Sequence, residues 1–219
     1  MLLAEQGIEG ASQEAERLLL WALSIRRIDL YIEPDRPVSL DAKTVFIDSI
    51  VRRGRREPLQ YIIGEVDFCG LSFRVRPGVF IPRPETELII QAVTESVKKG
   101  RPSPAQILDL CTGSGALAIT LAKQFPGAQV AAVDSSLPAL ETARENGARH
   151  GAQIDFLEGD LFGPVLSGKL FDLIVCNPPY IAEEGRAFMD PDVLHYEPNE
   201  ALFSPEGGMA HLKQVITQA

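Results

Sequence analysis

The amino-acid sequence predicts an α/β fold, with a mostly parallel sheet flanked by helices and a small helical region before it. Two observations support this prediction. From residue 106 onward, short apolar segments alternate with helical ones and no hairpin turn separates them, which is typical of a parallel sheet covered on both faces. Before residue 60, apolar residues recur at helical spacing instead. The change near residue 60 indicates two regions of different architecture.

Composition agrees with a folded chain and excludes several classes of protein. The 219 residues are 45% hydrophobic and 23% charged, close to the averages for globular proteins. The net charge of −9 would repel a phosphate backbone, so DNA is a disfavoured partner. Three cysteines without a CxxC pair argue for a reducing, cytoplasmic location and against a structural metal. No signal peptide or membrane span is expected.

The first region, residues 1–60, is expected to contain two main helices. Ser12 is the expected N-cap of the first, in SQEAERLLLWALS. The second is expected over about residues 41–54 and meets the basic run RRGRR at 52–56. That run fits a solvated helix end, and it also fits a docking patch for an acidic or RNA-rich partner.

An extended pattern follows over residues 61–81, in YIIGEVDFCG and LSFRVRPGVFIP. It predicts a β-hairpin that turns near Cys69 and Gly70 and links the two regions. Pro84 then opens a helix that has acidic residues in its first turn and lysines before Gly100, so both ends carry the expected signals.

The second region, residues 82–219, contains the alternation. Strands are expected at 106–110, 129–134, 153–158 and 171–176, and helices at 116–124 and 137–150. In such sheets, ligands bind at the carboxyl ends of the strands, where the strand order reverses. The last strand, FDLIVC, would have no partner on one side. We therefore expect the natural protein to be longer by several tens of residues.

The segment DLCTGSGALAITLA predicts a ligand-binding turn between a strand and a helix. Gly113 and Gly115 remove side chains where a ligand approaches the backbone, although a plain structural turn explains them as well. Asp134 closes the next strand, where a carboxylate can accept both hydroxyls of a ribose or can cap a helix. Ala118 stands at the third glycine position of the dinucleotide motif, so a smaller adenosyl ligand is favoured over a pyrophosphate.

The tetrapeptide NPPY, Asn177 to Tyr180, directly follows the fourth strand. Asn-Pro-Pro can simply end a strand. At the ligand crevice of this topology, however, the Asn177 oxygen and the Pro178 carbonyl can accept the two hydrogens of a planar NH2 group, while Tyr180 packs on its face. The sequence therefore predicts an amide or amine substrate.

These motifs together resemble the release-factor glutamine methyltransferase family, known as PrmC or HemK. The resemblance rests on GEVDFCGLSFRVRPGVFIPRPETE, DLCTGSGALAITLA, AAVDSSLPALETARENGARH, FLEGDLF, DLIVCNPPYI and HYEPNEALFSPEGG. It implies a helical N-terminal substrate-recognition domain (1–60), a β-hairpin linker (61–81) and a class I, Rossmann-like methyltransferase domain (82–219), apparently incomplete at its C-terminus. The implied reaction converts S-adenosyl-L-methionine to S-adenosyl-L-homocysteine. Its implied substrate is the glutamine amide in the GGQ motif of class I peptide chain release factors, a step of translation termination.

The resemblance also implies roles for individual residues. The implied cofactor contacts are Cys111, Thr112, Gly113, Ser114, Gly115, Asp134 on the ribose, Asp160 and Leu161 at the adenine, and Asn177. The implied amide site consists of Asn177, Pro178, Pro179 and Tyr180, with Asn177, Pro178 and Tyr180 catalytic. Cys111 departs from the family, which often has glycine there. The resemblance also places Phe80, Arg83, Glu85 and Glu87 near the cofactor cleft, although PRPETE can simply start a helix.

The expected mechanism is an in-line displacement in which the amide nitrogen attacks the methyl carbon, so positioning is the main task. Acceptors at Asn177 and Pro178 would hold the NH2 group and stabilise the developing positive charge. No metal is needed. The alternatives are an adenine-N6 DNA methyltransferase, a noncatalytic nucleotide-binding module and a nicotinamide dehydrogenase.

Overall fold

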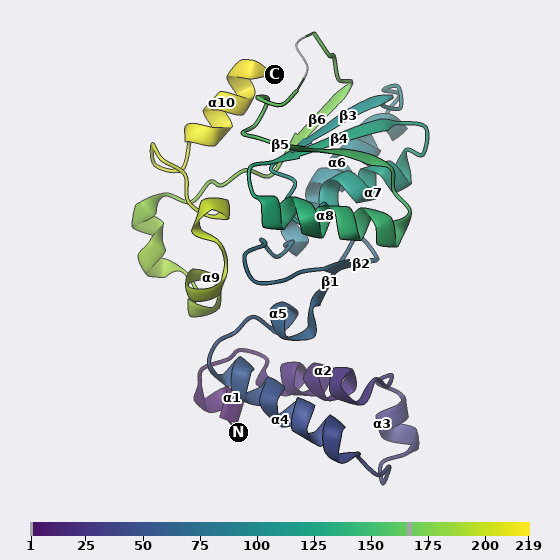
Figure 1. Cartoon of the computed structure of the whole chain (residues 1–219), viewed down its shortest axis with the longest axis vertical. Helices are drawn as coiled ribbons and strands as arrows, with labels where there is room; N and C mark the ends of the chain where they lie inside the picture. The colour runs from purple at the N-terminus through teal and green to yellow at the C-terminus, as the bar shows by residue number, and fades with distance from the viewer. Residues whose placement is uncertain (1, 166–167) are drawn as a thin grey trace. The chain divides into compact units, whose positions relative to one another are not determined.

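In the computed structural model of this chain, residues 2–165 and 168–219 are described. The chain forms two compact units (Figure 1). The first unit consists of Met1–Gly64 with Pro191–Tyr196, and the second consists of Glu65–Asp190 with Glu197–Ala219.

The first unit is helical. Its helices are α1 (Leu2–Glu5), α2 (Ala11–Leu23), α3 (Asp29–Ile32), α4 (Leu40–Gly54), α5 (Leu59–Ile63) and α9 (Pro191–Tyr196). Leu18 of α2 is fully buried against Leu59 and Ile62 of α5, with Trp21 packed beside them. Figure 1 shows α2 and α4 side by side, and the two helices are in contact.

The two expected helices exist, but the start of the first is corrected. Gly10 rather than Ser12 is the N-cap of α2, and no side chain caps this helix. A φ of 66° at Gly10 turns the chain into the helix before Ser12, which lies inside the first turn. The start of α4 is capped by Ser39, whose Oγ accepts from the amide of Ala42 at 3.2 Å.

The basic run at 52–56 is largely neutralised by acids of its own unit. Arg53 is 4% exposed, and its guanidinium contacts the carboxylates of Glu14 at 2.5 Å and Asp192 at 2.7 Å. Arg56 contacts Asp192 at 3.2 Å. Arg53 therefore fits neither a solvated helix end nor a docking patch, because it is a buried link between α2, α4 and α9.

The hairpin turns where the sequence predicts it. Strands β1 (Glu65–Phe68) and β2 (Leu71–Arg74) pair antiparallel around Cys69 and Gly70, whose φ values are 48° and 74°. Two positive φ values in succession match a tight hairpin turn. The start of the extended segment is corrected, because residues 61–63 belong to α5, where the amides of Tyr61 and Ile62 bond to the carbonyl of Pro58.

The second unit contains a four-stranded parallel sheet in the order β5-β4-β3-β6. Its strands are β3 (Gln106–Leu110), β4 (Gln129–Asp134), β5 (Ile154–Glu158) and β6 (Leu173–Cys176). The remaining elements are η1 (Pro84–Thr86), α6 (Glu87–Lys98), α7 (Ala116–Gln124), α8 (Leu137–His150), η2 (Glu183–Phe188), η3 (Asn199–Ala201) and α10 (Ala210–Gln218). The order reverses between β3 and β6, because the chain passes from β3 to β4 and β5 and then returns to the other side of β3.

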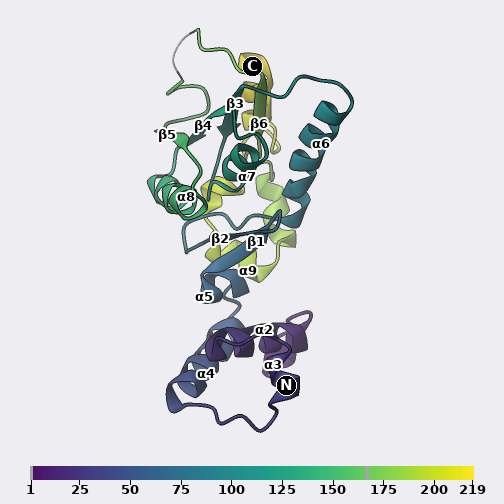
Figure 2. The same cartoon turned by 90° about the vertical axis from the view of Figure 1, so that its right-hand side faces the viewer.

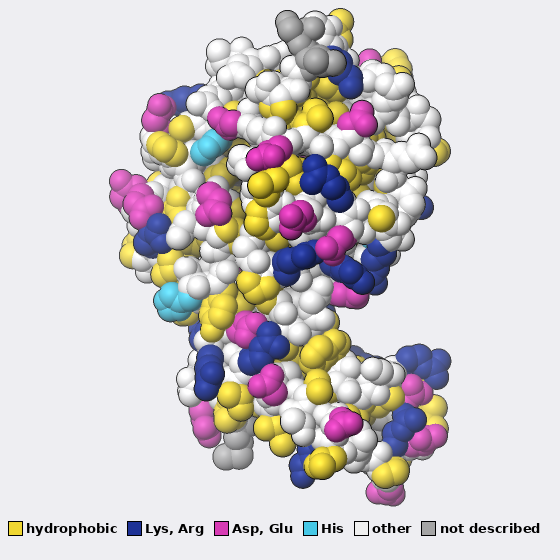
Figure 3. Space-filling view, viewed as in Figure 1, with side chains coloured by type: hydrophobic (Ala, Val, Ile, Leu, Met, Phe, Trp, Pro, Cys, Tyr) yellow, Lys and Arg dark blue, Asp and Glu magenta, His cyan; other side chains and the backbone are white. Residues whose placement is uncertain are grey.

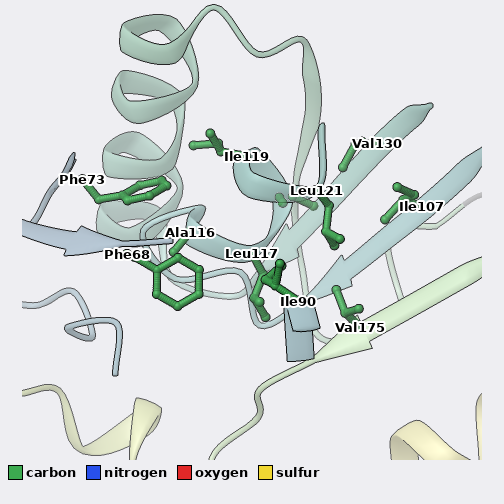
Figure 4. Packing of buried hydrophobic residues seen from close by; sticks show 12 residues of the cluster. Phe68, Phe73, Ile90, Ile107, Ala116, Leu117, Ile119, Leu121, Val130 and Val175 are labelled. Carbon is green, nitrogen blue, oxygen red and sulfur yellow. The ribbon is translucent and has the colours of Figure 1, made fainter. Parts of the chain in front are cut away.

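Apolar side chains cover both faces of this sheet, which explains why its strands are apolar on both sides. On one face, α6, α7 and the hairpin pack against the sheet around residues such as Phe68, Ile90 and Ile107 (Figures 2 and 4). On the other face, Leu161 and Val215 of α10 join a second cluster. The predicted α/β fold with a mostly parallel sheet is thereby confirmed.

We predict that replacing Arg53 with Met destabilises the first unit by about 3 kcal/mol, because two partly buried carboxylates lose their cation. Arg36→Met is the control, since Arg36 forms an exposed pair with Glu33 at 3.8 Å and should cost less than about 1 kcal/mol. Urea unfolding followed by the fluorescence of Trp21, the single tryptophan, reports on this unit. Equal midpoints for the two variants would contradict the prediction.

Candidate active site

Two loops leave the sheet side by side at the point where the strand order reverses. Leu110 of β3 is the register partner of Cys176 of β6. The next residues begin the two loops that the sequence predicts to bind the cofactor (111–115, called the cofactor loop) and the substrate amide (177–180, called the amide loop). Neighbouring strands lie about 4.8 Å apart, so the two loops start one strand spacing from each other.

Asp109, in strand β3, forms hydrogen bonds with the cofactor loop and with the first turn of α7. Its side chain is fully buried, and Oδ2 accepts from Thr112 Oγ1 at 2.6 Å and from the amide of Ala118 at 3.1 Å. Among the described residues, no donor reaches Oδ1. Burial raises the pKa of Asp109 to about 7, although the hydrogen bonds from Thr112 and Ala118 oppose this shift.

The two glycines of the loop serve different purposes. A Cβ at Gly115 would lie 3.1 Å from the Cβ of Ala143, so glycine allows α7 to begin close against α8. Gly113 has a φ of 57°, and a Cβ built there meets nothing within 4 Å. The backbone at Gly113 is therefore open to the approach of a ligand.

Asn146 of α8 ties the loop to the hairpin. Its side chain is 0% exposed, Oδ1 accepts from the amide of Arg74 at 2.8 Å, and Nδ2 donates to the carbonyls of Arg74 at 3.0 Å and Ser114 at 2.9 Å. Both hydrogens of Nδ2 and one of the two acceptor sites of Oδ1 are thus used inside the fold. One buried amide joins α8, the segment at the end of β2 and the cofactor loop.

Asp134 stands at the end of β4, beside the cofactor loop. Its Oδ2 accepts from the amide of Gly113 at 2.8 Å and its Oδ1 from the amide of Ser136 at 2.9 Å. Ser136 is the N-cap of α8, so the alternative interpretation of Asp134 as a helix cap is wrong. Burial raises the pKa of Asp134 against these hydrogen bonds. A carboxylate accepts about four hydrogen bonds, so Asp134 keeps capacity for a ligand.

Cys111 occupies a backbone conformation that favours glycine, with a φ of 57°. Its side chain packs in the apolar cluster that includes Leu110 and Cys176. The neighbouring Cys111 thiol, together with burial, raises the pKa of the Cys176 thiol well above its usual range. The thiol of Cys176 therefore stays protonated, and the apolar cluster accommodates the residue that departs from the family pattern.

Asp160 and Leu161 lie just after β5. Asp160 is exposed, and its carbonyl accepts from the amide of Gly163 at 2.8 Å. Leu161 is 4% exposed, has a φ of 45° and packs against Leu108 and Val133. The Leu161 side chain is thus part of the sheet core in this structure.

The amide loop is held from two sides. Pro178 and Pro179 are buried, whereas Tyr180 is 60% exposed. On one side, the Nδ2 of Asn177 donates to Thr86 Oγ1 at 3.4 Å. On the other side lies the backing segment, residues 202–208. Main-chain hydrogen bonds connect the backing segment to the end of the amide loop.

The backing segment bonds to the residue that follows the amide loop. The amide of Ile181 donates to the carbonyl of Leu202 at 3.0 Å, and the amide of Ser204 donates to the carbonyl of Ile181 at 2.9 Å. A Cβ at Gly208 would lie 3.0 Å from the carbonyl carbon of Tyr180 and 3.2 Å from the amide nitrogen of Ala182. Only glycine therefore fits at position 208 without moving this backbone.

The segment 81–87, IPRPETE, is anchored at both ends. Glu197 is 5% exposed, and its Oε2 accepts from the amide of Ile81 at 3.1 Å while its Oε1 pairs with Arg83. At the other end, Glu87 Oε1 accepts from the amide of Cys69 at 2.7 Å. The PRPETE segment is thus more than a helix start, because its charged residues bond to distant parts of the second unit.

Sequence reasoning missed four of these residues as contributors to the site, namely Thr86, Asn146, Glu197 and Gly208. Glu197 and Gly208 lie in HYEPNEALFSPEGG, a motif that signalled the family without assigning a role to either residue. Asn146 lies in the middle of a helix, where asparagine is unfavourable. An asparagine at an unfavourable helix position is the one sequence signal that Asn146 contacts distant parts of the chain.

The residues around the cofactor loop fit an adenosyl ligand. Ser114 is 2% exposed, and its Oγ has no partner among the described residues. Gly113 leaves its backbone open, and Asp134 retains acceptor capacity beside it. A hydroxyl group that can donate and a carboxylate that can accept hydrogen bonds thus lie beside a stretch of backbone that a ligand can approach.

Comparison with known proteins agrees with this arrangement. Residues 1–64 match the family model of the PrmC N-terminal domain, and residues 70–195 match that of the methyltransferase small domain. The release factor glutamine methyltransferase of Geobacter sulfurreducens is 42% identical over 217 residues, which cover 99% of this chain and 75% of that protein. The chain belongs to the release factor glutamine methyltransferase family. The methyltransferase domain of this family uses S-adenosylmethionine as its cofactor.

Further similarities concern the same family and the same fold. The release factor glutamine methyltransferase of Nitratidesulfovibrio vulgaris is 40% identical over 223 residues, covering 99% of this chain and 75% of that protein. The hMettl16 catalytic domain in complex with MAT2A 3'UTR hairpin 6 is similar in fold, with a TM-score of 0.52 and 18% identity over 78% of this chain and 62% of that one. The class I methyltransferase fold is thereby confirmed.

Within residues 2–165 and 168–219, no helix is long and apolar enough to cross a membrane. Over the same ranges, no group of three or more His, Cys, Asp or Glu side chains is arranged to hold a metal ion.

We predict that Asp109 makes the stability of the second unit depend on pH. Folding raises its pKa from the model-compound value of 3.8 to about 7, so its contribution is fully present below pH 4 and is lost as the pH rises through 7. Between pH 5 and pH 8 the loss is about 2 to 3 kcal/mol. Urea unfolding at both pH values, followed by far-ultraviolet circular dichroism, should show this loss in the wild type and not in Asp109→Asn. Parallel pH profiles would contradict it.

We also predict that Gly208→Ala destabilises the second unit more than Gly207→Ala. Both glycines have positive φ, 88° and 64°, so both substitutions cost about 1 to 2 kcal/mol of backbone strain. A Cβ at Gly207 meets nothing within 4 Å, whereas one at Gly208 displaces the backbone of Tyr180. Thermal denaturation should show a drop of roughly 2–8 °C for Gly207→Ala and a clearly larger one for Gly208→Ala. A Gly207→Ala protein as unstable as Gly208→Ala would refute this explanation.

Proposed function

We propose that this chain transfers a methyl group from S-adenosylmethionine to the side-chain amide nitrogen of a glutamine in a release factor. The finer proposal, which rests on the family resemblance, is the GGQ glutamine of class I release factors. The observation that supports it is the register of Leu110 with Cys176, because residues 111–115 and 177–180, the proposed cofactor loop and amide loop, begin directly after this pair. A methyl donor and an amide acceptor must meet at such a junction.

The cofactor would be held by residues 111–115 together with Asp134. Asp134 would accept from the ribose hydroxyls, Ser114 Oγ would gain the partner that it lacks inside the protein, and the open backbone at Gly113 would allow close approach. When bound, S-adenosylmethionine supplies an electrophilic methyl group on a sulfonium. Asp160 and Leu161 are proposed for the adenine. The burial of Leu161 leaves its backbone as the contacting part.

The amide loop would hold the substrate nitrogen. The Oδ1 of Asn177 and the carbonyl of Pro178 would each accept one hydrogen of the glutamine NH2 group, and Pro179 would complete the wall. Tyr180, which is 60% exposed, would cover the amide face. Two fixed acceptors align the nitrogen lone pair and stabilise the positive charge that develops on the nitrogen.

We further propose that residues 1–60 recognise the release factor, that 61–81 link the two parts and that 82–219 carry the chemistry. Exposed apolar side chains on the helical unit support a protein partner, since Tyr31, Ile32 and Leu40 are 69%, 67% and 77% exposed. These residues surround the end of α3 and the beginning of α4.

An adenine-N6 DNA methyltransferase is less well supported. The NPPY loop suits an exocyclic amine, but the net charge is −9 and acidic and basic side chains are interspersed on the face shown in Figure 3. A DNA-binding surface needs a concentration of basic groups. The relatives named above are release factor enzymes rather than DNA enzymes.

The function is tested by incubating the purified chain with methyl-labelled S-adenosylmethionine and a purified class I release factor, followed by peptide mass mapping. We expect one added methyl group on the glutamine of the GGQ peptide. A release factor in which that glutamine is replaced by glutamate is the control. Label on another residue, or none on the release factor, would overturn the proposal.

We predict that Asn177→Ala and Asp134→Ala lower activity in different ways. Asn177→Ala removes an oriented acceptor worth about 2.7 to 4 kcal/mol, so turnover should fall by about 100-fold or more while cofactor binding persists. Asp134→Ala should raise the Michaelis constant for S-adenosylmethionine about tenfold or more, with less effect on saturated turnover. Steady-state kinetics and calorimetric titration separate the two effects. An Asn177→Ala enzyme above about a tenth of wild-type turnover would rule out the amide clamp.

A further inference from the structure

The carboxamide of Asn177 has one contact that the proposed chemistry does not use. Its Nδ2 donates to Thr86 Oγ1 at 3.4 Å, across 91 residues of sequence. Within residues 2–165 and 168–219, no donor bonds to the Oδ1 of Asn177, which is the atom proposed to accept from the substrate. The side chain thus presents one edge to Thr86 and leaves the other available.

The hydroxyl of Thr86 bonds outside its own helical segment. Thr86 ends η1 and directly precedes α6, and its φ of −66° and ψ of −21° are helical, so no side-chain cap is expected at this position. Here the side chain makes no capping hydrogen bond, and its bond to Asn177 is the one side-chain bond found for Thr86 within the described ranges. Its hydroxyl is therefore directed at the amide loop rather than at its own helix.

Thr86 is also rigidly placed, because it lies inside the anchored segment 81–87. Glu197, almost fully buried, bonds to Ile81 and Arg83 before it, and Glu87 bonds to the amide of Cys69 directly after it. The amide of Thr86 itself donates to the carbonyl of Arg83 at 3.0 Å. Both sides of the position are tied to other parts of the second unit.

We propose that Thr86 is a positioning residue for methyl transfer, whose hydroxyl fixes the plane of the Asn177 carboxamide so that Oδ1 faces the substrate nitrogen. The inference rests on the proposed function of Asn177 and adds a residue that does not itself touch the substrate. A carboxamide is planar, so holding Nδ2 at one edge fixes the direction in which Oδ1 points. Without this contact the group rotates about its last side-chain bond, a torsion with broad, shallow minima.

The test compares Thr86→Val with Thr86→Ser. Valine has nearly the same shape as threonine but no hydroxyl, and serine keeps the hydroxyl. Because no capping bond is lost, we expect both variants to fold with melting temperatures close to the wild type. Thr86→Val should lower turnover about tenfold with little change in the Michaelis constants or in calorimetric affinity for S-adenosylmethionine, whereas Thr86→Ser should stay within about twofold of the wild type.

A double-mutant comparison shows whether Thr86 acts through Asn177. In an Asn177→Ala background, Thr86→Val should cause no further loss of single-turnover rate, because the group that Thr86 orients is gone. An equal further loss would show that Thr86 supports the fold in general and would overturn the proposal. Loss of turnover in Thr86→Ser equal to that in Thr86→Val would overturn it as well.

A spectroscopic readout keeps this inference separate from the proposed function. The side-chain amide signals of Asn177 in a nitrogen-15 spectrum are identified by their disappearance in Asn177→Ala. They should move in Thr86→Val and stay in place in Thr86→Ser, with no substrate present. Unmoved signals refute the contact even if the wild type methylates release factors. Moved signals with an inactive wild type refute the proposed function alone.

Discussion

Loop backbone outside the strands and helices has no ladder of main-chain hydrogen bonds to satisfy its polar groups, and this constraint shapes the candidate active site. Three buried polar side chains supply hydrogen-bond partners for this backbone. Asp109 accepts from the turn at the start of α7, Asn146 bonds to Arg74 and Ser114, and Glu197 accepts from the segment 81–87. Each of the three is at most 5% exposed, so each takes the place that water would occupy at an open loop.

Burying these polar side chains makes the site rigid, but it costs the free energy of their hydration. A buried carboxylate such as Asp109 is stable only when its surroundings compensate for lost hydration, and its pKa of about 7 shows that they do so incompletely. The same bonds hold the cofactor loop in one shape before any ligand arrives. A site prepared in this way loses less free energy to ordering when its substrates bind.

Much of the scaffold is predictable from sequence because its signals are local. The predicted bounds of α7 and α8 match the structure, since apolar spacing and end signals lie within the helices themselves. Local signals also mislead. Ser12 is a good capping residue, but Gly10 turns the chain first, and YII in 61–63 is β-prone, but Pro58 begins a helical turn.

The parts that sequence reasoning missed depend on contacts between distant residues. Glu197 meets Ile81 over 116 positions, Asn146 meets Arg74 over 72, and the basic run is neutralised by Asp192, far along the chain. The candidate loops themselves were found because glycine and proline mark them locally. Their supporting residues carry ordinary side chains whose role exists only in the folded protein.

The pairing of Leu110 with Cys176 also bears on how freely such a sequence can change. The span between the two loops is set by main-chain hydrogen bonds, which almost any side chain leaves intact except proline. Substitutions along β3 and β6 therefore leave that span unaltered as long as the core stays filled. One inserted residue in either strand would move its loop by about 3.3 Å relative to the other. These two strands can thus drift in composition over generations, but their lengths must remain matched.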